Sequence, residues 1–133
     1  MVVVDTNVVA YLLIHGDRTT DAQALYASDP DWRSDGFVLI EFSNILATYQ
    51  RTSGLTANAA ASLLSKAEQV LTGLMNLPHA RALAIAAEFG VAVYDARFLG
   101  AAQAFQSRLV TEDTKLRAAA PRLTRSLKDA LAR

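Results

Sequence analysis

Apolar runs in the first quarter of the chain predict a buried strand and two short helices. Residues 2–4 are three consecutive valines, and such a β-branched run is typical of a strand covered on both faces in a parallel sheet. Residues 6–14 then have helical spacing, which ends at His15-Gly16. A second helix is expected over about residues 20–27, because capping residues precede it and Asp29-Pro30 follows it.

The middle of the chain predicts two long helices. Residues 36–52 form an amphipathic pattern, with an apolar stripe at i, i+4, i+7 and i+11 made by Val38, Phe42, Ile45 and Tyr49. Glu41 lies inside the otherwise apolar segment 37–42, where a lone acid is costly unless it has a partner. An alanine-rich helix is expected from residue 55 to about residue 73.

The second half of the chain repeats the alternation of apolar run and helix. The expected strands are residues 74–77, a short run that starts at Arg108, and an edge strand at 123–126. The expected helices are 79–89, 96–106, 115–119 and a last turn or two at 127–132. Pro78 suits a first helical turn and Gly90 suits a helix end. This alternation indicates βαβ units around a parallel sheet.

The tryptophan and the two histidines are interpreted as residues without a catalytic role. A brief strand is expected at residues 31–33, and we interpret Trp32 as a surface-loop aromatic folded onto the core rather than a platform for bases. His15 and His79 are interpreted as surface residues, because no other histidine or cysteine lies near either of them in the sequence. The chain has no cysteine, which excludes a disulfide framework and a thiolate zinc site.

Composition and charge narrow the class of protein. A length of 133 residues with 52% hydrophobic residues predicts one compact domain over residues 1–133. Thirteen basic and thirteen acidic residues cancel, so the net charge does not indicate a nucleic acid or a membrane as partner. No apolar run approaches the ~20 residues of a membrane span and the N-terminus lacks signal-peptide features, so the cytoplasm is the expected location.

Four apolar segments each lead to a carboxylate, and these are Asp5, Glu41, Asp95 and Asp113. In open α/β sheets, ligands bind beyond the carboxyl ends of the strands, which is where Asp5 is expected. Taken singly, Asp5, Asp95 and Asp113 are explained at least as well as helix N-caps. Glu41 lies inside its predicted helix and has no such explanation.

If the four acids met, a divalent cation would be needed to balance them. Each pair of carboxylates about 5 Å apart would repel by roughly 3 kcal/mol at an effective dielectric constant near 20. Without an ion, some of the carboxyl groups should have raised pKa values. The ligands would all be oxygen atoms, which favours Mg²⁺ or Mn²⁺ over zinc. Such ions, held by a few carboxylates, water and substrate phosphate, are usual in phosphoryl chemistry.

Several segments resemble the PIN-domain ribonucleases. They are Val3–Val8 with Tyr11-Leu12, Glu41 in a mid-chain helix, the segment Tyr94-Asp-Ala-Arg-Phe-Leu-Gly-Ala-Ala102, and Thr111-Glu112-Asp113 with Leu116. The closest subgroup is the VapC-like toxins of bacterial toxin–antitoxin pairs. The resemblance covers essentially the whole chain, and it implies a three-layer α/β/α sandwich with a central, mainly parallel sheet.

The resemblance also implies roles for individual residues. The catalytic residues and ligands of Mg²⁺ or Mn²⁺ would be Asp5, Glu41, Asp95 and Asp113. Thr6 and Thr111 match polar positions that support the ligands, and the extra acid Glu112 either joins the site or points outward. RNA would be bound by basic residues near the site, for each of which a solvated face is an equally good explanation: Arg97, Lys115 and Arg117, with Arg33 and Arg51 as further candidates.

Together these observations predict metal-dependent hydrolysis of RNA phosphodiester bonds, leaving a 5′-phosphate and a 3′-hydroxyl. Asp5, Glu41 and Asp95 are expected to hold mainly one ion, with Asp113 toward a second. Similarity to the toxins implies a homodimer and a small antitoxin partner.

Other classes of function fit the same residues less well. The main alternative is a catalytically silent module that binds RNA or a basic peptide through the acidic groove. A phosphatase of the haloacid dehalogenase type needs a second acid where this chain has Asn7. No glycines have the spacing of a dinucleotide-binding or P-loop motif.

Overall fold

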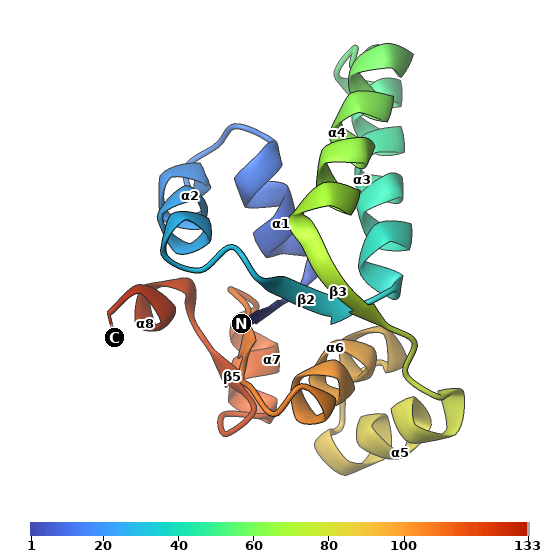
Figure 1. Cartoon of the computed structure of the whole chain (residues 1–133). Helices are drawn as coiled ribbons and strands as arrows, with labels where there is room; N and C mark the ends of the chain where they lie inside the picture. Colours follow the sequence, from blue (N-terminus) through green and yellow to red (C-terminus); the bar gives the residue numbers. More distant parts are fainter. Residues whose placement is uncertain (133) are drawn as a thin grey trace.

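The structure is a computed structural model that describes residues 1–132, in which a parallel sheet lies between two layers of helices (Figure 1). The strands are β1 (Val2–Val4), β2 (Trp32–Asp35), β3 (Leu71–Met75), β4 (Leu109–Val110) and β5 (Thr124–Arg125). The helices are α1 (Thr6–Leu13), α2 (Thr19–Ser28), α3 (Phe37–Thr52), α4 (Ala57–Val70), α5 (His79–Phe89), α6 (Val93–Ala104), α7 (Thr114–Ala119) and α8 (Leu127–Leu131). This is the three-layer α/β/α architecture that the sequence predicts.

The order of the strands in the sheet reverses direction at β1. The order is β3-β2-β1-β4-β5, and every neighbouring pair is parallel. The chain therefore builds outward from β1 to β2 and β3, and then continues on the other side of β1 with β4 and β5. Ligands of open α/β sheets bind beyond the carboxyl ends of the strands at such a reversal. The carboxyl ends of β1 and β4 are thus the expected place for a site.

The two central strands are fully buried, and their pairing sets the position of the residues at their carboxyl ends. Every residue of β1 and β4 has an exposed fraction of 0%. Val4 pairs with Val110 in the parallel ladder, so the next residues, Asp5 and Thr111, come to lie side by side. On one face of the sheet α6 packs against β1, β2 and β4 and α5 packs against α6, while α1 to α4 pack together on the other face (Figure 1).

A buried ion pair joins three segments that surround this end of the sheet. Asp35, the last residue of β2, is 1% exposed, and its Oδ2 accepts a hydrogen bond from Arg97 Nε of α6 at 3.0 Å. Asp35 also accepts from the backbone N–H groups of Phe37 at 2.8 Å and of Leu77 at 2.9 Å. Arg97 donates in addition to the carbonyl oxygen of Leu77 at 2.7 Å and to Asn76 Oδ1 at 3.0 Å. The pair therefore fixes the start of α3, the β3–α5 connection and α6 relative to one another.

Several sequence predictions about the fold are confirmed. The helix predicted at residues 36–52 is α3, and the helix predicted at 79–89 has the same bounds as α5. Gly90 ends α5 with a left-handed backbone (φ 66°), as a glycine after a helix commonly does. The expected edge strand near the C-terminus is β5. Among residues 1–132, no helix is long and apolar enough to cross a membrane.

Three predictions about the fold are wrong. Trp32 is not a surface-loop residue: it is fully buried in β2 and meets the Tyr26 ring edge-on, with the ring centroids 5.4 Å apart. The alanine-rich helix ends at Val70, and the strand expected at 74–77 is instead Leu71–Met75, because the apolar residues there fit either period. The helix expected at 96–106 lies three residues earlier at its start, since α6 spans Val93–Ala104 and includes the end of the apolar run before Asp95.

We predict that Asp35→Asn lowers the free energy of unfolding by about 3–5 kcal/mol, because it leaves the buried guanidinium of Arg97 without a charge partner. The matched control is Asp31→Asn, which removes the partner of Arg33 in a pair with side chains 38% and 36% exposed. This control should cost much less, since water can replace the lost partner. Urea unfolding of the two variants measures the difference, and equal losses would contradict the assigned role of the buried pair.

Candidate functional site

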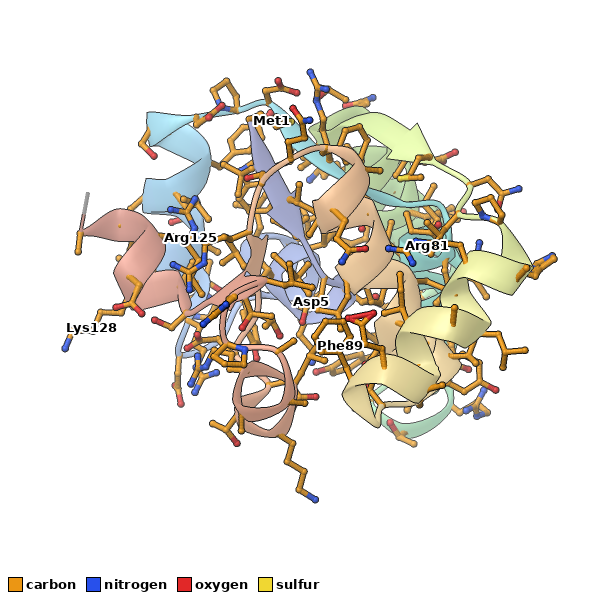
Figure 2. All side chains as sticks on the ribbon, turned by 90° about the horizontal axis from the view of Figure 1, so that it is seen from below. Met1, Asp5, Arg81, Phe89, Arg125 and Lys128 are labelled. Carbon is orange, nitrogen blue, oxygen red and sulfur yellow. The ribbon has the colours of Figure 1, made fainter. Side chains whose placement is uncertain are left out.

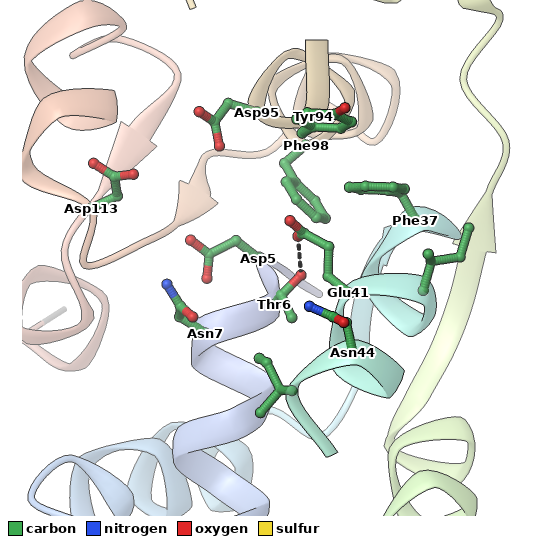
Figure 3. A pocket seen from close by; sticks show the side chains of 12 residues that line it. Asp5, Thr6, Asn7, Phe37, Glu41, Asn44, Tyr94, Asp95, Phe98 and Asp113 are labelled. Carbon is green, nitrogen blue, oxygen red and sulfur yellow. Dashed lines mark hydrogen bonds between the residues drawn. The ribbon is translucent and has the colours of Figure 1, made fainter. Parts of the chain in front are cut away.

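A pocket of about 490 Å³ opens where β1 and β4 end, and its walls come from segments far apart in the sequence (Figure 3). Asp5 lies near the centre of the face shown in Figure 2. All four predicted acids line the pocket, with neighbours from α1, α3 and α6: Asp5, Thr6, Asn7, Phe37, Ile40, Glu41, Asn44, Ile45, Tyr94, Asp95, Phe98 and Asp113.

Asp5 is the most buried of the four acids, with an exposed fraction of 6%. Its Oδ1 caps α1 by accepting from the backbone N–H of Val8 at 3.1 Å, and its Oδ2 accepts from the hydroxyl of Thr111. Burial raises the pKa of Asp5 from 3.8 to about 6, although these two hydrogen bonds oppose the shift. The charges of Glu41 and Asp113 raise it further. Asp5 is therefore both the N-cap of α1 and part of the pocket lining.

Glu41 has the partner that its apolar surroundings require. Thr6, the first residue of α1, donates its hydroxyl to Glu41 Oε1 at 2.6 Å, which links α1 to α3 across one side of the pocket (Figure 3). Thr6 is 5% exposed. Its position in the structure fits the supporting role that the family resemblance implies.

Asp95 and Asp113 face the pocket from the opposite side (Figure 3). Asp95 lies in the first turn of α6, and burial, followed by the charges of Asp113 and Glu41, raises its pKa. Asp113 is exposed and caps α7, since its Oδ1 accepts from the backbone N–H of Leu116 at 3.0 Å. The backbone N–H of Asp113 donates to Thr111 Oγ1 at 3.1 Å. Thr111 therefore contacts two of the four acids.

One wall of the pocket is aromatic, and sequence reasoning did not predict it. The rings of Phe37 and Tyr94 stack with centroids 5.4 Å apart and an angle of 13°, and Phe98 lies 6.3 Å from Phe37. Tyr94 directly precedes Asp95, which was the available signal in the sequence. Two amides, Asn7 and Asn44, complete the polar lining.

Two residues predicted near the site have other contacts. Arg97 is 8% exposed and pairs with Asp35, so its guanidinium is held in a buried ion pair and does not line the pocket. Glu112 is not part of the pocket lining. Its Oε2 accepts from Arg117 Nη1 at 3.0 Å and from the backbone N–H of Leu127 at 2.9 Å, so it joins α7 to α8.

The other predicted basic residues do not line the pocket either. Arg117 donates to Glu112 and to the carbonyl oxygen of Thr111, and Arg33 pairs with Asp31. Lys115 is exposed on α7, and Arg51 is exposed near the far end of α3. Within residues 1–132, the lining of the acidic pocket includes no lysine, arginine or histidine.

The donor set of the pocket suits a hard divalent cation. Four carboxylates, two hydroxyls and two amide oxygens line it, and among the described residues the lining has no imidazole or thiol. Burial, and after it the charges of neighbouring acids, raises the pKa of Asp5 and of Asp95, and no cationic side chain among the described lining residues opposes these shifts. In the described part of the chain, however, no three Asp, Glu, His or Cys side chains are grouped closely enough to form a ready-made ion site. A few carboxylates with water and substrate oxygens would then complete the ligand set, as Mg²⁺ commonly requires.

The sequence of this chain matches the model of the PIN domain over residues 2–121. The chain belongs to the PIN-domain family. PIN-domain proteins are generally nucleases, and the family usually uses divalent metals. The match includes all four segments that carry the acids of the pocket.

The PIN fold is also found by comparison with solved structures. The structure is similar to the crystal structure of PAE2754 from Pyrobaculum aerophilum, with a TM-score of 0.79 and 22% sequence identity. The comparison covers 97% of this chain and 90% of that chain. At this identity the similarity supports the fold alone. A search of the curated proteins found no match.

The raised pKa of Asp5 predicts a pH-dependent stability in the absence of metal. The Asp5 carboxyl group has a pKa of 3.8 in the unfolded chain and of about 6 in the folded protein. The folded protein therefore loses stability as the pH rises through this window. The full penalty, up to about 3 kcal/mol for a shift of about two pH units, is present above pH 6. Asp5→Asn removes the charge and keeps an N-capping side chain. It should therefore stabilise the protein at pH 7.5 and have little effect below pH 4.

Urea unfolding in EDTA at the two pH values measures this difference. Asp17→Asn, a change at an exposed acid, serves as the control and should not stabilise the protein at pH 7.5. A loss of stability in Asp5→Asn at pH 7.5 would contradict the assignment of Asp5 as an uncompensated buried carboxylate.

Proposed function

We propose that this PIN-domain protein is an endoribonuclease that depends on Mg²⁺ or Mn²⁺. The observation that carries the proposal is the convergence of Asp5, Glu41, Asp95 and Asp113 on one pocket at the reversal point of the sheet. No cationic side chain balances these acids among the lining residues of the described chain. A polyanionic substrate can approach such a pocket only if a bound cation neutralises it.

Each residue of the pocket has a distinct part in this proposal. Asp5, Glu41 and Asp95 would hold mainly one ion, and Asp113 would lie toward a second. A divalent ion at these carboxylates supplies a water of lowered pKa and neutralises charge on the phosphoryl oxygens. Thr6 and Thr111 hold two of the carboxylates by hydrogen bonds and so limit the positions that these ligands can take.

The remaining polar and aromatic groups would position the substrate. Asn7 and Asn44 offer both donors and acceptors to the ribose and base of a nucleotide. The stacked rings of Phe37 and Tyr94 provide an apolar wall, and the ring of Tyr94, whose residue is 60% exposed, offers a face to a base. Water would attack the phosphorus atom in line with the 3′ oxygen. Cleavage of that P–O bond leaves a 5′-phosphate and a 3′-hydroxyl.

We further propose that the protein is the toxin of a cytoplasmic toxin–antitoxin pair and acts as a homodimer. The support is the resemblance of the Val3–Val8 and Tyr94–Ala102 segments to VapC-like toxins. The chemistry of the pocket supports it as well, because a basic segment of an antitoxin would balance the four acids. A gene for a small protein beside the gene for this chain, and inhibition by its product, would test this part of the proposal.

The second candidate is a catalytically silent module that binds RNA or a basic peptide through the same pocket. The observation that favours it is the lack, among residues 1–132, of three grouped ligands that form a ready-made metal site. Calorimetry separates the two functions. Binding of RNA or peptide without any binding of Mn²⁺ would favour the silent module.

The proposed activity predicts the loss of RNA cleavage in Asp5→Asn and, for the wild type, in EDTA. The loss should be at least about 100-fold, because even groups that only orient metal ligands contribute 10–100-fold. Gel analysis of a labelled single-stranded RNA measures cleavage, and end-group analysis should find 5′-phosphates. Asp129→Asn is the control for removal of an exposed acid that does not line the pocket, and circular dichroism verifies the fold. Cleavage that survives both Asp5→Asn and EDTA would overturn the proposed mechanism.

A further inference from the structure

A second groove adjoins the acidic pocket and shares two of its lining residues. This groove, of about 510 Å³, lies between α1, α3 and the loop that leads to α2, and Asn7 and Ile45 line both it and the acidic pocket. We name it the tyrosine groove, because Tyr11 of α1 and Tyr49 of α3 contribute to its lining.

Side chains of α1 and α3 line both the acidic pocket and the tyrosine groove. On α3, Glu41, Ile45 and Tyr49 are four residues apart, so they lie on one face at steps of about 6 Å. Glu41 lines the acidic pocket, Ile45 lines both cavities and Tyr49 lines the tyrosine groove. The acidic end of this row is held to α1 by Thr6. The groove is therefore a continuation of the acidic pocket along α1 and α3.

The tyrosine groove carries the features that bind single-stranded nucleic acid. The ring of Tyr49 offers a surface for stacking, since this residue is 41% exposed. The guanidinium of Arg18 lies over the ring of Tyr11, 5.5 Å from its centroid, and Nη1 donates to the Tyr11 hydroxyl at 3.3 Å. The side chain of Arg18 is 48% exposed, which leaves it accessible to a phosphate group.

The distribution of charge distinguishes the groove from the acidic pocket. The acidic pocket is lined by four acids and, among the described residues, by no basic side chain. The tyrosine groove is lined by Arg18 and His15, with Asp17 as its acid. Glu112 Oε1 lies 3.5 Å from Arg18 Nη1, and the Glu112 side chain is 18% exposed. Of the two cavities, the groove is thus the one that can attract a phosphate without a metal ion.

We propose that the tyrosine groove binds the segment of single-stranded RNA next to the scissile phosphate. The inference rests on the proposed function, because it takes the acidic pocket as the place of cleavage. One base stacks on Tyr49 and a phosphate contacts Arg18, while Asn7 lies between this nucleotide and the acids. A basic peptide is disfavoured in this groove, because Arg18 would repel it.

Fluorescence anisotropy with a short fluorescein-labelled single-stranded RNA of mixed sequence, in EDTA, tests the proposal. Tyr49→Ala should weaken binding by about 5-fold or more, since one stacked base is lost. Tyr49→Phe keeps the ring and should bind like the wild type. Arg18→Ala should lower the slope of log Kd against log salt concentration by about 0.7, the value for one phosphate contact with a single strand.

Two control variants separate a specific contact from general effects. Glu112→Gln removes the ion-pair partner but keeps Arg18, so its salt slope should equal that of the wild type. Lys128→Ala removes an exposed cation at the edge of the molecule, far from Asp5 in Figure 2, and should also keep the wild-type slope. If Tyr49→Ala binds as tightly as Tyr49→Phe, or if Arg18→Ala changes the slope no more than Lys128→Ala, the proposal is overturned.

The test distinguishes failure of this inference from failure of the proposed function. If cleavage depends on Asp5 but RNA affinity does not depend on Tyr49 or Arg18, the nuclease proposal stands and the groove has no part in it. If Asp5→Asn cleaves like the wild type while Tyr49→Ala binds RNA more weakly, the proposed mechanism fails and the groove is still an RNA-binding site.

Discussion

The carboxylate of Asp5 stands at the end of a fully buried strand, and the architecture of the site depends on how the chain accommodates it. The parallel pairing of β1 with β4 leaves Asp5 beside Thr111, whose hydroxyl donates to it, and the start of α1 gives it one backbone donor. These are neutral donors. They oppose the cost of burial without cancelling it, and the pKa of Asp5 remains raised. A divalent cation would neutralise the negative charge of Asp5 that these two hydrogen bonds do not compensate.

The contrast with Asp35 shows that the chain can balance a buried acid when the role is structural. Asp35 lies at the end of the neighbouring strand, with a guanidinium and two backbone donors on its carboxylate. That pair fixes the start of α3 and the position of α6, the helices that carry Glu41 and Asp95. The buried arginine therefore has a structural role, and among the described residues that line the pocket the charged ones are all acids. An imbalance of this kind lowers stability and is typical of a functional site.

The sequence was sufficient to predict the fold class and the four acids, because each signal is local. A strand that ends in an acid predicted Asp5, and a lone acid on an apolar helix predicted Glu41, which does have a partner in Thr6. The sequence did not specify the direction in which each side chain points. Arg97 follows Asp95 by two residues, which is about 200° around a helix, so it points into the core while Asp95 faces the pocket. Glu112 directly precedes Asp113 in the chain, yet it contacts α8. The aromatic wall depends on how α3 meets α6, which no local pattern specifies.

Calorimetric titration of Mn²⁺ into EDTA-stripped protein at neutral pH measures whether the acids of the pocket share a divalent cation. If they do, the wild type binds Mn²⁺ saturably, and this binding is lost when Asp5 and Asp95 are both replaced by asparagine. Wild-type protein that is folded and binds no Mn²⁺, or a double variant that binds it as well as the wild type, would contradict the account.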